Sequence, residues 1–187
     1  MTITLITGAN KGIGFETARQ LSAWGHVVYI GARDVERGEK AAAALGARFV
    51  QLDVTDDASV RAALAAIDSA EGRLDVLVNN AGVLGDGATD GPTALRAFDT
   101  NAVGVVRVTE AALPLLRKSS NPIVVTVSSS AGSFWAVTNP DRPEFDLPLA
   151  RPYRHRRAAL ERLCAEHRLT APWALCPSTT DPATVRQ

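Results

Sequence analysis

The sequence predicts an α/β fold of the Rossmann type, a three-layer structure in which helices cover both faces of a doubly wound parallel sheet. Short runs rich in β-branched residues alternate with helical periodicity over five successive units. These runs are apolar throughout, which is typical of strands that are buried on both faces. A glycine-rich turn also joins the first run to the first helical segment.

Local signals define the first elements. A strand is predicted at Thr2–Thr7, a β-branched run that ends at a glycine. Helical periodicity follows over Ile13–Trp24, and Gly25 stands where a left-handed C-terminal cap belongs. Val27–Ile30 is the second predicted strand.

The next elements repeat this pattern. Asp34 can cap a helix that runs to Leu45, and Phe49–Leu52 forms the third predicted strand. Thr55 or Asp56 opens the third helix, which ends at a glycine at position 72.

The last regular elements are a fourth strand, a long helix and a fifth strand. The strands are predicted at Val76–Val78 and Ile123–Val127. The helix spans Thr93 to Arg117, with an expected kink near Pro114 because proline lacks the N–H of a helical hydrogen bond.

The composition suits one soluble domain. The chain has 187 residues, equal numbers of basic and acidic residues, and no apolar run of the roughly 18 residues that a membrane span needs. No charge excess draws it to nucleic acid or to a membrane surface. Its two cysteines, Cys164 and Cys176, lack a metal-ligand spacing, so we expect no metal site and a cytoplasmic location.

The single domain divides into three parts by composition. These are a core at 1–132, a Pro-rich insertion at 133–150 and a divergent C-terminal segment at 151–187. All 14 glycines lie at or before Gly132, whereas six arginines fall between Arg151 and Arg168. A buried sixth strand should be rich in Val and Ile, and Trp173–Leu175 is a poor candidate.

The turn at 7–14 reads TGANKGIG and predicts a phosphate-binding loop. Glycines let the backbone approach a pyrophosphate, and the free N–H groups of the following helix point at its charge. The alternative is an ordinary glycine-rich turn. The predicted contacts are Gly8, Asn10, Lys11, Gly12, Ile13 and Gly14.

The end of the second strand favours NADP(H) over NAD(H). An NAD site usually has an acidic residue here, but this chain has Arg33, which suits a 2′-phosphate, with Lys11 as a second cation. Asp34 is the competing residue, although it is better suited to capping the next helix. Arg33 as a solvated surface charge is the alternative.

Polar residues follow the third and fourth strands at the same edge of the sheet. Asp53, beside Val54, can accept from an adenine amino group or can cap a helix. Asn80, Ala81 and Gly82 follow the fourth strand and are predicted to border the cofactor, although asparagines also form turns.

These motifs, with Asn101 and the segment VSSSAG at 127–132, resemble the short-chain dehydrogenase/reductase family. The runs TGANKGIGFETARQL, YIGARDVERG and LDVTD are similar to its NADPH-dependent carbonyl-reductase branch. The resemblance covers residues 1 to about 132. It implies hydride transfer between a nicotinamide and the carbonyl carbon of a small-molecule substrate.

The resemblance also implies catalytic roles. Ser129, three residues before Gly132, binds the substrate oxygen, and Asn101 helps to fix a proton-relay water. Tyr153 is the general acid, and Arg157 occupies the position of the family's lysine. The alternative is that Tyr153 merely lies near a basic helix start.

The resemblance does not extend to the C-terminal segment, because the last strand or strands of the family are not recognisable after Tyr153. A reading-frame change explains the segment, which is rich in Arg, Pro and Ala, and natural divergence or shortening is the alternative. The chain is therefore interpreted as a carbonyl reductase, or else as a non-catalytic NADP(H)-binding protein. A nucleotide-sugar epimerase is disfavoured by the glycine spacing, and both a monomer and a homo-oligomer are compatible with the sequence.

Overall fold

The computed structural model describes residues 1–84, 90–130, 133, 135, 139 and 141. Its backbone contacts group the chain into two compact units, Met1–Val127 and Ser128–Gln187. The sheet and its helices lie in the first unit. Most of the predicted insertion at 133–150 and all of the segment at 151–187 lie outside the described residues.

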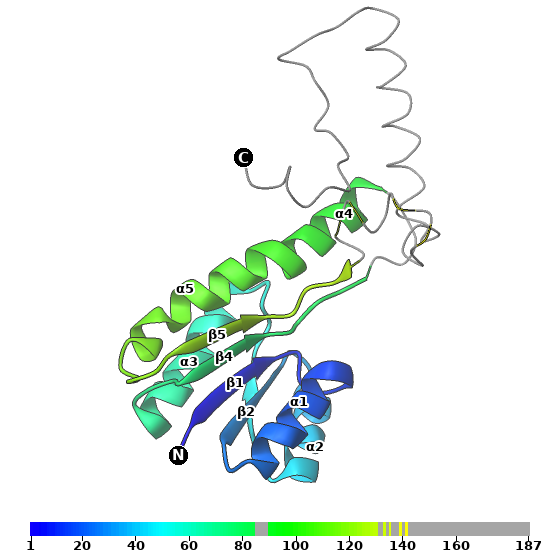
Figure 1. Ribbon diagram of the computed structural model, residues 1–187. Coiled ribbons are helices and arrows are strands. Elements are labelled where there is room, and N and C mark those ends of the chain that lie inside the picture. The colour runs from blue at the N-terminus through cyan, green and yellow to red at the C-terminus, as the bar shows by residue number, and fades with distance from the viewer. Residues whose placement is uncertain (85–89, 131–132, 134, 136–138, 140, 142–187) are drawn as a thin grey trace, which may run out of the picture. The chain divides into compact units, whose positions relative to one another are not determined.

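A five-stranded parallel sheet forms the centre of this unit, in the order β3-β2-β1-β4-β5. β1 lies between β2 and β4, so that Leu5 is in register with Tyr29 on one side and with Leu77 on the other (Figure 1). The order reverses between β1 and β4, which confirms the doubly wound topology. The strands are β1 Ile3–Thr7, β2 Val27–Ala32, β3 Arg48–Gln51, β4 Val76–Asn79 and β5 Ile123–Thr126.

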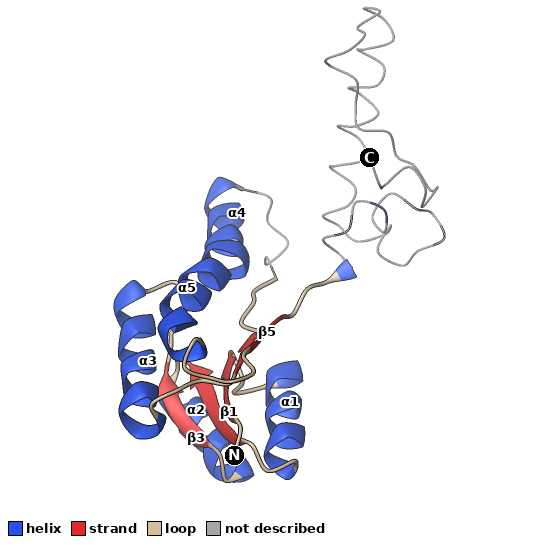
Figure 2. Ribbon diagram, turned by 60° about the vertical axis from the view of Figure 1, so that its left-hand side comes forward, coloured by secondary structure: helices blue, strands red, loops and turns tan. Residues whose placement is uncertain are grey.

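Helices cover both faces of the sheet (Figure 2). Ile3 and Leu5 belong to one buried cluster, with apolar residues of α3 and α5, whereas Ile6 belongs to a second cluster with small residues of α1 and α2. Alternate side chains of β1 therefore pack into two separate cores, as expected for a strand that is buried on both faces. The helices are α1 Gly12–Ala23, α2 Val35–Leu45, α3 Asp57–Glu71, α4 Gly91–Phe98 and α5 Gly104–Leu116.

The helix ends match the predicted caps. Asp34 accepts a hydrogen bond from the backbone N–H of Arg37, and Asp56 accepts one from Ala58. Left-handed glycines end α2 and α3. Gly25, just after the C-cap residue of α1, has a φ of +84°, as predicted from its position.

The predicted long helix needs a correction. It begins at Gly91, and its irregularity lies in a π-helical segment, η1 Asp99–Val103, and not at Pro114. The proline falls near the end of α5, and the helix continues past it to Leu116. The π-helical segment accommodates one extra residue per turn, which changes the direction in which its side chains point.

β5 also differs from the expected buried strand. It is the edge strand on the β4 side in the described part of the chain, and all of its residues are exposed. Among the described residues, no helix combines the length and the apolar character needed to cross a membrane.

Two polar networks stabilise the amino edge of the sheet. Asp75 accepts hydrogen bonds from the Ile3 backbone, the Ser119 hydroxyl and the Arg73 guanidinium. Burial works to raise the pKa of Asp75, but these donors outweigh it and hold the pKa below its ordinary value. In the second network, the Tyr29 hydroxyl donates to Glu71, and Arg48 contacts both groups.

Candidate functional site

A cleft of about 360 Å³ opens at the carboxyl edge of the sheet, where the strand order reverses between β1 and β4. All the predicted cofactor residues except Gly14 line this single cleft. The lining comprises Gly8, Asn10, Lys11, Gly12, Ile13, Ala32, Arg33, Leu52, Asp53, Val54, Thr55, Asn80, Ala81, Gly82 and Thr100.

Two glycines give the loop its shape. Gly8 has a φ of +67°, and a Cβ there would lie 2.8 Å from the Cα of Ala81, so no larger residue fits. Gly12 has a φ of +59°, but a Cβ there would meet no protein atom within 4 Å. The loop thus packs tightly against the end of β4 at Gly8 and leaves free space at Gly12.

Gly14 has a packing role. It is buried, and a Cβ at this position would clash with the side-chain amide of Asn80 and lie 3.0 Å from the Cα of Ala9. This glycine therefore lets α1 approach the turn after β4. The third glycine of the motif is required for close packing of helix against strand.

The N-terminus of α1 has no side-chain cap. Lys11 occupies the N-cap position with an extended backbone, and no acidic residue lies in the first turn. By contrast, aspartates cap α2, α3 and α4. The free N–H groups and the positive end of the helix dipole make this end of α1 suited to an anion.

Thr7 and Asn80 join the glycine loop to β4. The Thr7 hydroxyl accepts hydrogen bonds from the backbone N–H groups of Asn80 and Ala81, at 3.0 and 2.9 Å. The Asn80 amide donates to the carbonyl oxygens of Thr7 and Gly8, at 2.8 and 3.3 Å. Asn80 thus borders the cleft while its amide group supports the loop. Thr7 is a site residue that was not predicted, although it directly precedes the first glycine of the loop.

Asp53 presents a carboxylate at the other end of the cleft. Its Oδ1 accepts hydrogen bonds from the backbone and the hydroxyl of Thr55, at 2.9 and 2.7 Å. Burial works to raise the pKa of Asp53, but these bonds, with the positive charges of Arg33 and Arg107, outweigh it and lower the pKa. The group is therefore ionised at neutral pH and acts as an acceptor only.

Cations gather beside the cleft. A second depression of about 420 Å³ adjoins it and is lined by Asn10, Lys11, Arg37 and Lys40, among others. Arg33 lines the cleft itself. Arg37 and Lys40 were not predicted as site residues, although their spacing in the first turns of α2 places them on one helix face.

Asn101 lies in the π-helical segment. Its Oδ1 accepts a hydrogen bond from the Val83 backbone N–H at 2.8 Å, and its Nδ2 donates to the Val83 carbonyl at 2.9 Å. The side chain is thereby held against the turn that follows β4, close to Gly82. No pattern in the sequence predicts this π-helical geometry.

The remaining predicted catalytic residues fall outside this unit. Ser129 belongs to the second unit, and Tyr153 and Arg157 lie outside the described residues. Their roles stay predictions.

Comparison with known proteins identifies relatives of the chain. The model of the short chain dehydrogenase family matches residues 2–139. Salutaridine reductase of Papaver bracteatum is 37% identical, and the match covers 74% of this chain and 58% of the relative. (-)-Isopiperitenone reductase of Mentha piperita is 38% identical, and the match covers 72% of this chain and 59% of the relative. The chain thus spans less than two thirds of the length of these relatives.

The fold is similar to that of a solved actinorhodin polyketide ketoreductase, the F189W variant with NADPH. The TM-score is 0.67 and the sequence identity is 28%. The match covers 88% of this chain and 64% of the other.

Proposed function

Because this chain belongs to the short-chain dehydrogenase/reductase family, we propose that it binds NADP(H) in the cleft at the carboxyl edge of the sheet and reduces a carbonyl compound. The substrate class is a ketone, an aldehyde or a quinone. One observation carries the proposal: the uncapped start of α1, the free space at Gly12 and the cations all meet at one cleft.

The residues of the cleft fit a dinucleotide. The N–H groups at the start of α1 suit the pyrophosphate, and the ionised carboxylate of Asp53 suits the amino group of adenine. Asp34 is engaged in capping α2, which favours a 2′-phosphate over a free 2′-hydroxyl beside Arg33. Lys11 and Arg37 supply further positive charge there.

The reaction follows from the family resemblance. When bound, the nicotinamide supplies the hydride that the carbonyl carbon accepts. Ser129 holds the carbonyl oxygen by a hydrogen bond, and Tyr153 donates the proton that this oxygen gains. Arg157 stabilises the resulting phenolate, and Asn101 helps to fix the water that returns the proton. The reductases among the relatives and the ketoreductase solved with NADPH support this reaction class.

A second candidate is a non-catalytic NADP(H)-binding protein. It is favoured by Arg157, because a planar guanidinium replaces the compact ammonium of the family's lysine. Both candidates share the cleft and differ only in turnover.

One experiment separates the two candidates. NADPH binding is followed by fluorescence titration, and NADPH oxidation is followed with a panel of ketones, aldehydes and quinones. For a reductase, Tyr153→Phe should lower turnover by about 10²–10⁴-fold without loss of NADPH binding. Arg157→Lys should raise turnover. Binding without turnover in all three proteins would favour the non-catalytic candidate, and absence of NADPH binding would exclude both.

A further inference from the structure

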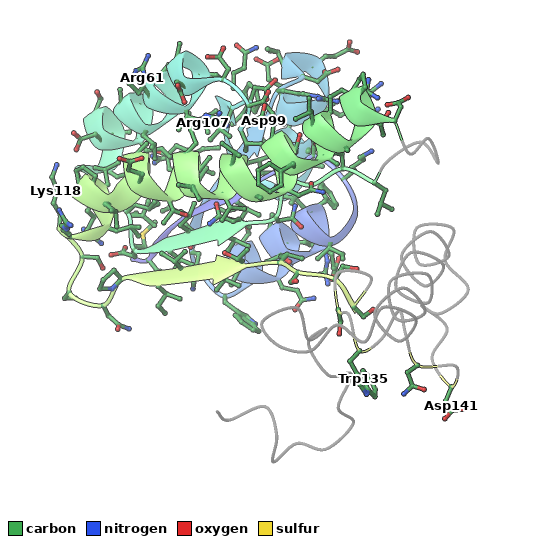
Figure 3. All side chains as sticks on the ribbon, turned by 90° about the horizontal axis from the view of Figure 1, so that it is seen from above. Arg61, Asp99, Arg107, Lys118, Trp135 and Asp141 are labelled. Atoms are coloured by element: carbon green, nitrogen blue, oxygen red, sulfur yellow. The ribbon has the colours of Figure 1, made fainter. Side chains whose placement is uncertain are left out.

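Arg107 on α5 connects parts of the chain that are distant in sequence (Figure 3). Its Nε lies 2.5 Å from the carboxylate of Asp57, its Nη1 donates to the Val54 carbonyl at 2.5 Å, and its Nη2 lies 3.3 Å from Asp99. The side chain is only 19% exposed. A planar guanidinium can make three such contacts at once, whereas an ammonium on a flexible stem does not fix their geometry.

The contact with Val54 fixes one wall of the cleft. Val54 lines the cleft next to Asp53, in the loop between β3 and α3. α5 begins close to this loop, because a Cβ on Gly104 would lie 2.9 Å from the Cγ2 of Val54. The loop therefore rests on the first turn of α5, and Arg107 holds its backbone there.

The contact with Asp99 fixes the π-helical segment. Asp99 is the first residue of η1, Thr100 lines the cleft, and Asn101 pairs with the backbone of Val83. The segment is thus held on one side by Arg107 and on the other by Val83.

We propose that Arg107 is a positioning residue that sets the wall formed by Val54 and, through Asp99, the orientation of Asn101. One guanidinium would then align the adenine end of the cleft with the residue at its catalytic end. The adenine and catalytic assignments rest on the proposed function, whereas the two structural effects of Arg107 do not.

Full-length variants test the proposal. Arg107→Met keeps the apolar stem and removes the guanidinium group, and Arg107→Lys keeps the positive charge. Asp99→Asn weakens only the contact with η1, because it removes the negative charge that faces Nη2 of Arg107. Arg61→Met is the matched control, because Arg61 is exposed and lines the same groove between α3 and α5 but does not line the cleft. The measurements are the dissociation constant for NADPH and the amide hydrogen exchange of Val83 by NMR.

Arg107→Met should raise the dissociation constant for NADPH by roughly two- to tenfold, because the unanchored Val54 wall would have to be ordered when NADPH binds. It should also speed the exchange of Val83 by about tenfold, because the N–H of Val83 donates to Asn101. Asp99→Asn should speed this exchange with a smaller change in affinity. Arg107→Lys should restore part of both effects, and Arg61→Met should change neither.

The failures are distinguishable. If the unmodified chain does not bind NADPH, the proposed function is wrong, and the exchange of Val83 alone decides the role of Arg107. If the exchange of Val83 is unchanged in Arg107→Met and Asp99→Asn, Arg107 does not orient Asn101. If the NADPH affinity is unchanged in Arg107→Met, Arg107 does not position the wall formed by Val54. If Arg107→Met does not fold, Asp99→Asn still decides the first point, because Asp99 is 43% exposed.

Discussion

The side-chain amide of Asn80 donates a hydrogen bond to the carbonyl oxygen of Thr7 across 2.8 Å, so that the turn after β4 holds the last residue of β1. Thr7 completes the link, because its hydroxyl accepts from the backbone N–H groups of Asn80 and Ala81. Thr7 is 1% exposed, so water does not reach this hydroxyl. One buried side chain, Thr7, therefore holds the glycine loop to the end of β4 together with the Asn80 amide.

Thr7→Val should lower the free energy of unfolding by about 1–3 kcal/mol, because valine keeps the shape but leaves buried donors unpaired. It should also weaken NADPH binding, since the loop loses its anchor. Urea denaturation and fluorescence titration measure the two effects. Thr4→Val is the control: Thr4 is buried in the same strand, and its hydroxyl contacts His26 at the opposite end. Equal losses of NADPH affinity in the two variants would show that the Thr7 link has no specific role.

Gly12→Val should abolish most NADPH binding, because its side chain would enter the free space next to the start of α1. The matched control is Gly46→Val, since Gly46 has nearly the same φ, +61°, and equally open surroundings at the end of α2. Both variants force a branched residue into a left-handed conformation, which costs roughly 1–2 kcal/mol of stability. Only Gly12→Val should lose affinity for NADPH in isothermal titration. Similar NADPH affinities in the two variants would show that the phosphate site does not lie at Gly12.

Arg33→Ala should narrow the difference in affinity between NADPH and NADH. A charge-assisted hydrogen bond to the 2′-phosphate contributes about 1.5–3 kcal/mol, or roughly tenfold or more in affinity. The titrations are run with both dinucleotides. Arg19→Ala, on the exposed side of α1 and paired with Glu16, should leave the ratio unchanged. Equal affinities of the unmodified chain for NADPH and NADH would refute the assignment of Arg33.

Asp75 should make the stability depend on acid pH. Its pKa in the folded state lies below its ordinary value of 3.8, so its contribution is present above about pH 4 and is lost as the pH falls through the folded pKa. Asp75→Asn should therefore be less stable than the unmodified chain at neutral pH, by about 1–2 kcal/mol, with a smaller difference near pH 3. Asp68→Asn, which breaks only an exposed pair with Lys118, should have little effect at either pH. A constant difference for Asp75→Asn in urea denaturation at the two pH values would contradict this role.

Much of the fold could be predicted because its signals are local. β1, the glycine loop and the cap at Asp34 are each encoded within a few consecutive residues. Strand ends were less predictable: β2 continues beyond Ile30 to Ala32, because Gly31 and Ala32 pair with β3 despite weak strand preferences. The exposure of β5 depends on what packs beside it, which a strand's own residues do not specify.

The site was predictable where a motif is continuous in sequence, as in residues 8–14. Arg107 was not, because it belongs to no recognisable pattern and its partner Val54, although part of the LDVTD run, lies 53 residues away. The π-helical segment was also missed, since an extra residue in a helical turn leaves no periodic mark in five residues. These features arise from tertiary packing.

The networks around Asp75 and Tyr29 lie at the amino edge of the sheet, whereas the cleft opens at the carboxyl edge. A strand of four to six residues separates the two edges by roughly 13–20 Å. Substitutions at the amino edge can therefore be chosen for thermal tolerance without altering the groups that face a ligand. For protein engineering, this separation removes the usual conflict between a more robust scaffold and a preserved binding site.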